Sequence, residues 1–496
     1  MVEEIWKLLK HTAIYGMGSV LAKVVGFLMI PFYTHYLTPA DYGTLELLDL
    51  SLSLAALVLT MWLNASVLRH YNDFNKEDDR NQAVSTILVV AFGIGLSVAA
   101  LGIWFARGLS ALILNNPEIH YFVSLEAVSF FITSINVVCL SYLRAQQRSK
   151  TIVTVNLISL VMALGLNIYF IGIRRNGPVG VLYSNLISST LITGLLLARL
   201  LGRIGLSFSL GKLREIATFG VPLIVTSVAA FTVNFSDRFF LRHFSTLATV
   251  GIYALGYKFG FVLSLLIVQP FDMIWQARLY DIEKRTDSGS VFGYLFEYYA
   301  FVLITAALVL SVAIKDLIAL TTPPQFHAAA AVVPIVALAY IFQGANRFFL
   351  AGAYIAKRTM PLGVVGLTSA TVNIVLNLLL IPRYGMLGAA WATAASFFLM
   401  AGLALSVSQS VHRIPYVFSR VVTMGGLAMI TYFLADGIVM PSFRLQALCK
   451  GVVLAAFPVA LYSGGFFNQR EVETGKVFAQ QVLAKCGILR VAVSER

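Results

Sequence analysis

The sequence predicts an all-α protein that crosses a membrane many times, and two observations support this prediction. Of the 496 residues, 58% are hydrophobic and only 12% are charged, whereas a soluble protein of this length exposes far more charge. Uncharged apolar runs of roughly 20 residues also recur from one end of the chain to the other. These runs lack the period-two alternation of barrel strands, so they favour helices, which satisfy their own backbone hydrogen bonds in lipid.

The apolar runs define fourteen candidate transmembrane helices, joined by short connections. The longest connections, at residues 69–81 and 276–290, have roughly a dozen residues, so no loop is long enough for a soluble domain of ordinary size. In chain order the predicted spans cover residues 12–37, 44–68, 82–106, 119–143, 151–172, 178–198, 216–241, 247–275, 291–314, 328–352, 361–381, 387–408, 417–435 and 445–467.

The loop charges predict the orientation of the chain. The even-numbered loops, counted from the N-terminus, hold more than twice as many Lys and Arg residues as the odd-numbered loops. Because cytoplasmic loops carry the excess of positive charge, both termini are expected in the cytoplasm. That result agrees with an even number of spans.

The chain also repeats itself. His35–Gly43 (HYLTPADYG) resembles His243–Gly251 (HFSTLATVG), and Asn176–Gly180 matches Tyr384–Gly388 at the same offset of 208 residues. Spans 1–6 and 7–12 are therefore predicted to be two copies of one six-helix unit, a common plan for secondary transporters. The predicted divisions are a first lobe at 1–205, a second lobe at 206–412, two further helices at 413–470 and a cytoplasmic tail at 471–496.

Charged residues inside the predicted spans are the main candidates for function, since a charge at the bilayer centre costs roughly 2.5–3.5 kcal/mol even on lenient scales. One interpretation is a partly cationic, water-filled lumen that attracts an anionic substrate such as a phosphate. Alternatively, Asp237 and the adjacent Arg238 form a structural ion pair. The candidate lumen cations are Lys23, Arg238, Lys258 and Arg347.

Carboxylates within the spans are candidates for proton or sodium coupling, because acids inside a membrane often serve as relays. The simpler alternatives are helix capping for Glu46 and pairing with a lumen cation for the others. The candidates are Glu46, Asp49, Glu126 and Asp237.

Other chemistry is not indicated by the sequence. The acids Glu77, Asp78 and Asp79 lie in a short polar loop typical of a solvated segment, and the histidines and cysteines lack metal-ligand spacing. There is no Gly-rich phosphate loop with its Lys, so a built-in ATPase is not expected. We expect no metal, no cofactor and no nucleic-acid partner, although the net charge is +13.

Two stretches resemble a known family. Asn234–Leu241 (NFSDRFFL) with Val250–Lys258 (VGIYALGYK) is similar to the start of the second lobe in bacterial polysaccharide flippases, and Pro31–Gly43 resembles the opening of the first lobe. These flippases are the Wzx-type O-antigen and exopolysaccharide translocases. Their superfamily, the multidrug/oligosaccharidyl-lipid/polysaccharide exporters, also contains lipid II flippases and multidrug and toxin extruders (MATE).

The resemblance implies a fold of two six-helix bundles in a V shape, with helices 13 and 14 at the side. It implies transport of undecaprenyl-pyrophosphate-linked oligosaccharides from the cytoplasmic to the outer face of the inner membrane by alternating access. The partners would be this lipid-linked substrate, the membrane lipids, and a polysaccharide polymerase and glycosyltransferases of the same pathway. By place and charge, Lys23, Arg238 and Lys258 would meet the pyrophosphate, with Arg347 a less secure match.

Two alternatives stay open at this point. A MATE-like exporter of cationic drugs would have an acid-dominated lumen and, in that family, usually twelve spans. A membrane glycosyltransferase or polymerase would need a large outer loop with catalytic residues, and no loop of this chain is long enough. The sequence therefore favours a transporter over an enzyme.

Overall fold

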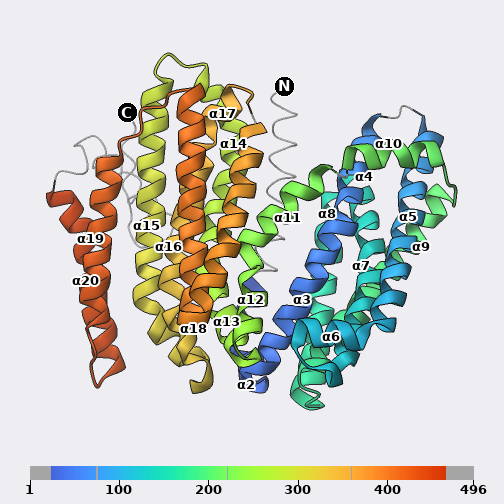
Figure 1. Cartoon of the computed structure of the whole chain (residues 1–496), viewed down its shortest axis with the longest axis horizontal. Helices are drawn as coiled ribbons and strands as arrows, with labels where there is room; N and C mark the ends of the chain where they lie inside the picture. The colour runs from blue at the N-terminus through green and yellow to red at the C-terminus, as the bar shows by residue number, and fades with distance from the viewer. Residues whose placement is uncertain (1–23, 74–75, 221, 359, 465–496) are drawn as a thin grey trace, which may run out of the picture. The chain divides into compact units, whose positions relative to one another are not determined.

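The computed structural model describes residues 24–73, 76–220, 222–358 and 360–464, and every regular element in them is helical. Figure 1 shows these helices in chain order. The first half contains α2 (Ile30–Tyr36), α3 (Pro39–Leu59), α4 (Met61–Asp73), α5 (Glu77–Trp104), α6 (Ala106–Leu114), η1 (Pro117–Ile119), α7 (His120–Ala145), α8 (Ser149–Asn167), η2 (Ile168–Ile173), α9 (Pro178–Ile204) and α10 (Leu210–Gly220).

The second half continues without a strand among the described residues. It contains α11 (Pro222–Phe235), α12 (Asp237–Phe244), α13 (Leu247–Leu263), η3 (Ser264–Val268), α14 (Gln269–Glu283), α15 (Ser288–Thr321), η4 (Pro324–Ala331), α16 (Val333–Phe349), α17 (Ala351–Ile355), α18 (Met360–Val411), α19 (Phe418–Asp436) and α20 (Phe443–Ser463).

Eleven helices in the described part of the chain are long and apolar enough to cross a membrane. The 52-residue α18 contains two helices that meet at Gly385, whose φ of 55° and ψ of −130° are not helical. Residues 12–23 of the predicted first span lie outside the described residues, and the described residues of the predicted span 216–241, apart from Ser236, belong to α10, α11 and α12. The chain is thus an all-helical, multi-pass membrane protein, while the count of fourteen stays a prediction.

The helices form two compact units. The first comprises Met1–Tyr280 with Ile314–Arg413, and the second comprises Asp281–Ala313 with Ile414–Arg496. Within the second unit, Arg420 at the start of α19 forms an ion pair of 2.9 Å with the buried Glu297 of α15. This pairing offsets the cost of placing the Glu297 carboxylate inside an apolar helix.

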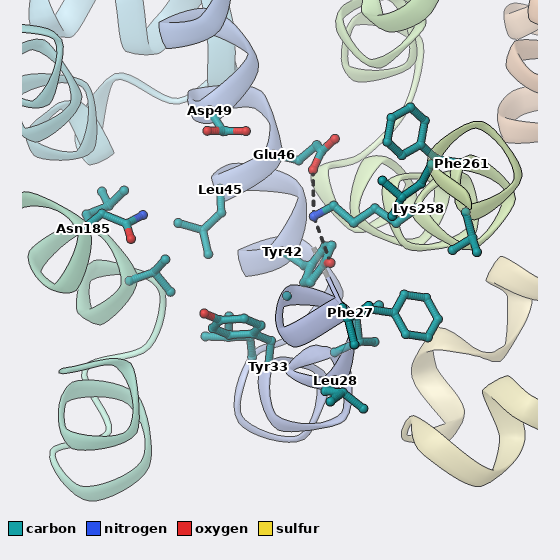
Figure 2. Close-up of a pocket in the computed structure, with 18 of the residues that line it drawn as sticks. Phe27, Leu28, Tyr33, Tyr42, Leu45, Glu46, Asp49, Asn185, Lys258 and Phe261 are labelled. Carbon is teal, nitrogen blue, oxygen red and sulfur yellow. Dashed lines mark hydrogen bonds and ion pairs between the residues drawn. The ribbon is translucent and has the colours of Figure 1, made fainter. Parts of the chain in front are cut away.

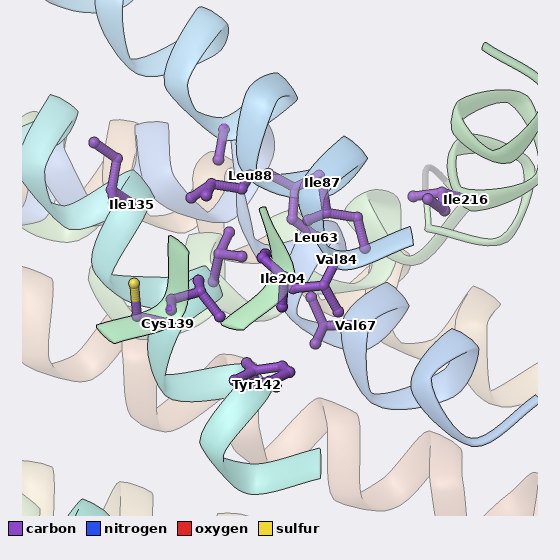
Figure 3. Packing of buried hydrophobic residues seen from close by; sticks show 13 residues of the cluster. Leu63, Val67, Val84, Ile87, Leu88, Ile135, Cys139, Tyr142, Ile204 and Ile216 are labelled. Atoms are coloured by element: carbon purple, nitrogen blue, oxygen red, sulfur yellow. The ribbon is translucent and has the colours of Figure 1, made fainter. Parts of the chain in front are cut away.

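The hydrophobic core of the first unit is divided between its two halves. One cluster joins α4, α5, α7, α9 and α10 around Leu63, Ile87 and Val138, which are at most 1% exposed (Figure 3). A second cluster joins α11, α16 and α18. Elsewhere, large apolar side chains such as Val161 and Leu195 are exposed, as expected for surfaces that face lipid.

The two copies of the repeated HYLTPADYG segment begin helices in the same way. The side chain of Thr38 accepts a hydrogen bond from the Asp41 backbone N–H at the start of α3, and that of Thr246 accepts one from the Thr249 N–H at the start of α13. Such caps satisfy N–H groups that the first helical turn leaves unpaired. The same residue type therefore caps both helices at the offset of 208 residues.

The glycines of these two segments pack against each other. A Cβ atom added to Gly43 would overlap the Leu247 carbonyl oxygen, and one added to Gly251 would overlap the Pro39 carbonyl oxygen. Pro39 and Leu247 are themselves equivalent at the offset of 208, so the contact between α3 and α13 is symmetric. Small residues permit this close approach of two helix backbones.

Two further turns match between the halves. Gly177 and Gly385 share a positive φ, 59° and 55°, before the helical segments that start at residues 178 and 386. Gln147 and Lys357 also share a positive φ of 56° after α7 and α17. These correspondences are what a duplicated unit would produce, while the predicted lobe boundaries stay a prediction.

Candidate functional site

A large cavity lies within the first unit and has a volume of about 610 Å³ (Figure 2). Its walls come from residues 24–37, α3, α7 and α9 of the first half, and from α13 and η3 of the second half. Most of the lining is apolar, including Leu28, Leu45 and Phe261. Tyr42, Glu46 and Asp49 of α3 face Lys258 of α13 in one polar wall, and further polar residues come from α7 and α9.

Glu46 of α3 is the centre of the polar wall. Its Oε2 lies 3.2 Å from Lys258 Nζ, and its Oε1 lies 3.8 Å from Arg238 Nε. Lys258 Nζ also donates a hydrogen bond of 3.0 Å to the Tyr42 hydroxyl and lies 4.6 Å from the centre of the Tyr42 ring. One carboxylate of the first half thus pairs with two cations of the second half.

Arg238 and Lys258 differ in how accessible they are. The Arg238 side chain is 2% exposed, whereas the Lys258 side chain is 47% exposed and lines the cavity. Arg238 Nη1 lies 2.7 Å from Asp237 Oδ1, and its guanidinium carbon lies 3.8 Å from the centre of the Tyr257 ring. Arg238 is therefore enclosed by its own partners, and Lys258 is the cation that a molecule in this cavity would meet.

Asp237 is fully engaged within the second half. Its Oδ1 accepts hydrogen bonds from the backbone N–H and Nη1 of Arg238, and its Oδ2 accepts them from the hydroxyls of Tyr253 and Thr393. The side chain is 1% exposed. Asp237 and Arg238 thus form an ion pair, as in one of the two alternatives that the sequence left open, and its role stays a prediction.

Two other carboxylates line the cavity, and neither forms an ion pair of 4 Å or less among the described residues. Asp49 follows Glu46 by one helical turn on α3, and Glu126 comes from α7. Glu126 Oε2 is buried and has no hydrogen-bond partner in the described part of the chain. Asn185 of α9 lies on the opposite side of the cavity from Lys258 (Figure 2). The described lining thus carries Glu46, Asp49 and Glu126 against the single amine of Lys258.

The other predicted site residues lie elsewhere. Arg347 of α16 is 3.8 Å from Asp272 of α14 and does not line this cavity. Lys23 lies outside the described residues. Of the eight candidates, the structure brings together Glu46, Asp237, Arg238 and Lys258 directly, and Asp49 and Glu126 along the same cavity. Their roles in transport stay predictions.

Sequence reasoning missed the uncharged members of the site. Tyr42 precedes Glu46 by four residues, so both lie on one face of α3, and this spacing could have identified Tyr42. Asn185 stands in an apolar run as an isolated amide, a weaker signal of the same kind. Thr393 has no local signal, because its contact with Asp237 spans 156 residues.

Comparison with known proteins decides the family. Residues 34–331, more than half of the chain, match the family described as polysaccharide biosynthesis protein. The chain belongs to this family. The match begins just before the capped start of α3 and includes the whole polar wall formed by Glu46, Arg238 and Lys258.

Curated relatives come from Haemophilus influenzae. A protein of the Lsg locus is 24% identical over 267 residues, which are 53% of this chain and 63% of that protein. An uncharacterized membrane protein is 23% identical over 268 residues, 53% of this chain and 62% of that protein. The matched part thus spans less than two thirds of these relatives.

Solved structures share the fold at low sequence identity. The lipid II flippase MurJ in an inward closed conformation has a TM-score of 0.76 and 13% identity, covering 92% of this chain and 100% of that one. An inward-facing MATE family multidrug resistance transporter has a TM-score of 0.61 and 11% identity, covering 79% and 97%. The protein therefore has a MurJ-like and MATE-like fold.

Proposed function

We propose that the protein is a flippase, not an enzyme, that moves undecaprenyl-pyrophosphate-linked oligosaccharides from the cytoplasmic to the outer face of the inner membrane. One observation carries this proposal. The large cavity has an apolar lining and a half-exposed amine, Lys258, placed between the two halves of the first unit. An amphiphile with an anionic head needs both features, since apolar walls accept the lipid part and a cation meets the phosphate.

The Lys258 amine is placed so that a ligand can replace one of its present partners. Its Nζ is shared between Glu46 and Tyr42, and nearly half of its side chain is accessible. A pyrophosphate in the cavity competes with Glu46 for this amine, and Arg238 lies on the other oxygen of the same carboxylate. Binding of the substrate therefore weakens a link between the two halves and favours their rearrangement.

The proposed transport cycle is alternating access between two six-helix lobes. The symmetric contact at Gly43 and Gly251 closes one end of the cavity, and the lobes separate there in the opposite state. The proposal includes fourteen crossings, both termini in the cytoplasm, and cooperation with glycosyltransferases and a polymerase that build and consume the glycan. The shared fold with a lipid II flippase supports this choice of substrate class.

Transport in cells tests the proposal. The full chain is expressed in a bacterium that makes a polyprenyl-linked glycan and lacks its own flippase. A lectin that recognises the glycan and cannot cross the membrane then labels intact spheroplasts. Labelling should return with the wild-type chain and be about tenfold weaker with Lys258→Ala at equal protein level. No labelling with any expressed level of wild-type chain would overturn the proposal for that glycan class.

The acidic balance of the cavity favours a second candidate. Three carboxylates face one amine among the described lining residues, and an acidic cavity attracts organic cations. A MATE-like cation-coupled drug exporter would use Asp49 and Glu126 for the drug or the coupling ion. Efflux of ethidium from cells that express the chain, lost in Asp49→Asn, would support that function over glycan transport.

A further inference from the structure

A second cluster of cations lies in the first half, near the ends of α7 and α9, whereas the cavity lies near the starts of these helices. The side chains of Arg148, Arg199 and Arg203 line one small hollow between the end of α7, the start of α8 and the last turns of α9. Arg199 and Arg203 are four residues apart on α9, so they share a face and repel each other unless an anion lies between them.

None of Arg148, Arg199 and Arg203 forms an ion pair of 4 Å or less in the part of the chain that the structure describes, whereas Lys212 is paired with Asp79. The acid Glu77 acts electrostatically on Tyr142 in the wall of the hollow, alongside Arg148 and Arg203. Gln146 also lines the hollow, and its buried side-chain oxygen has no hydrogen-bond partner. Rotating this amide by half a turn presents an N–H₂ donor at the same place without a change of shape.

The backbone fixes Arg148 at this point. Gln147 adopts a positive φ of 56°, and the Arg148 N–H donates to the Leu143 carbonyl over 3.0 Å, which closes α7 tightly. Arg148 is then the N-cap of α8, and no side chain caps this helix start. A helix N-terminus without a cap favours an anion nearby.

The matching turn of the second half lacks the site. Lys357 has the same φ of 56°, and the Arg358 N–H donates to the Ala353 carbonyl over 2.9 Å. In place of the two arginines of α9, however, α18 carries Val407 and Val411 at the offset of 208 residues.

The space between the helices differs as well. Gly352 packs directly on Ser408 of α18 and on His412, which follows that helix, and an added Cβ would lie 2.8 Å from the His412 carbonyl oxygen. Gly352 lies five residues before the turn at Lys357, and the residue five before the matching turn at Gln147 is Tyr142. Tyr142 lines the hollow and belongs to the core cluster around Cys139 and Ile204 (Figure 3). A tyrosine thus occupies the position where the second half has a glycine in close contact with its neighbours.

We propose that Arg148, Arg199 and Arg203 form a binding site for the phosphate group of an anionic lipid. Guanidinium groups pair with phosphate oxygens in a bidentate manner, which suits three arginines that line one hollow and form no ion pair among the described residues. The hollow holds only about 20 Å³, so it accepts a single phosphoryl oxygen while the rest of the headgroup lies over the arginines. Basic pockets between helices at the cytoplasmic face are typical binding sites for such headgroups.

Two lipids of the same membrane carry this chemistry. One is an anionic phospholipid, and the other is a polyprenyl pyrophosphate. A phospholipid site goes beyond the proposed function, whereas a polyprenyl pyrophosphate site rests on it and would be the place where the substrate docks before it enters the cavity.

Native mass spectrometry of the purified full-length protein tests the proposal. Cardiolipin, phosphatidylglycerol, undecaprenyl pyrophosphate and the zwitterionic phosphatidylcholine are added separately, and bound lipid is counted for each. The variants are Arg199→Gln with Arg203→Gln, the charge-conserving Arg199→Lys with Arg203→Lys, and Arg358→Gln as the matched control from the second half. Elution on size exclusion shows that each variant is folded.

We expect the double Gln variant to bind anionic lipid at least about tenfold more weakly than wild type, the loss of roughly one charged hydrogen-bonded contact. The Lys variant should be intermediate and Arg358→Gln unchanged. Loss confined to cardiolipin and phosphatidylglycerol assigns a phospholipid, and loss confined to undecaprenyl pyrophosphate assigns the substrate. The proposed site is overturned if the wild type and the double Gln variant bind anionic lipid equally. It is also overturned if the wild type binds phosphatidylcholine as strongly as the anionic lipids.

Discussion

The helices α3 and α13 are alike in backbone and opposite in charge. Both begin at a threonine cap, and they pack through equivalent glycines, Gly43 and Gly251. Within about two turns beyond this contact, α3 carries Glu46 and Asp49, whereas α13 carries Lys258. The shared backbone explains how two halves can meet and separate, and the unlike side chains explain what the space between them can bind.

The comparison also separates two kinds of cation. Arg238 is enclosed with Asp237 beneath the Tyr257 ring, and Lys258 is open to the cavity. Both contact Glu46, so proximity alone does not distinguish them. The exposed fractions of their side chains do distinguish them, and they predict that substitution by Ala has different consequences at the two positions.

Arg238→Ala should have the largest effect, and the effect should be on stability. The substitution leaves the 1% exposed Asp237 without its cation, and breaking a buried ion pair costs about 3–5 kcal/mol. The amount of full-length protein in the membrane, measured by immunoblot, should fall strongly. Adding Asp237→Asn to Arg238→Ala should restore part of it. Normal protein levels in Arg238→Ala would show that the pair is not structural.

Gly251→Ala should have the second largest effect, because it disturbs the contact between α3 and α13. The added methyl group overlaps the Pro39 carbonyl, and overpacking of this kind costs about 1–3 kcal/mol. The state in which α3 and α13 pack through Gly43 and Gly251 then falls at least about tenfold in population, so glycan export should decrease. Lectin labelling of spheroplasts measures export.

Gly194→Ala is the control for this glycine. No atom lies within 4 Å of a Cβ added to Gly194, so export should be unchanged. If Gly251→Ala and Gly43→Ala both export as well as Gly194→Ala, the symmetric contact between α3 and α13 is not part of the transport cycle.

Lys258→Ala should reduce export about tenfold, equivalent to about 1.4 kcal/mol, with little change in protein level. Its side chain is half exposed, so its loss costs less stability than the loss of Arg238. Lys258→Arg keeps the charge and should retain more activity than Lys258→Ala. Equal export by Lys258→Ala and wild type would remove this residue from the site.

Asp49→Asn and Glu126→Gln should have the smallest effects on binding and should alter coupling instead. Both carboxylates line the cavity without a cation partner among the described residues, so either can take up an ion. In vesicles with an imposed proton or sodium gradient, the acceleration of transport by the gradient should shrink in these variants. Transport without a gradient should be unchanged; a full response to the gradient in both variants would contradict a coupling role.

Much of the architecture could be predicted because it follows from patterns among residues that are close together in the sequence. Apolar runs locate the helices, and the repeated segments at Thr38 and Thr246 locate the capped helix starts. The offset of 208 residues even pairs Gly43 with Gly251, although nothing in the sequence shows that the two glycines touch. Within the predicted span 216–241, the turn at Ser236 separates α11 from α12, which the apolar pattern did not indicate.

The site could be predicted only in part, because its geometry depends on contacts between distant residues. Charge in an apolar run singled out Glu46, Arg238 and Lys258, yet the pairing of Glu46 with Lys258 joins residues 212 positions apart. The exposure of each cation depends on packing: aromatic rings enclose Arg238 and leave Lys258 open. Arg347 carries the same signal in the sequence, but it pairs with Asp272 outside the cavity.

The most direct test of transport uses the purified full-length protein in vesicles. A fluorescent undecaprenyl-pyrophosphate disaccharide is placed in both leaflets, and dithionite, which does not cross the membrane, quenches the outer pool. With the wild-type protein, the account predicts that the inner pool also becomes accessible, and that it does so more slowly with Lys258→Ala. An inner pool as protected with the wild-type protein as in protein-free vesicles, with and without an ion gradient, would contradict it.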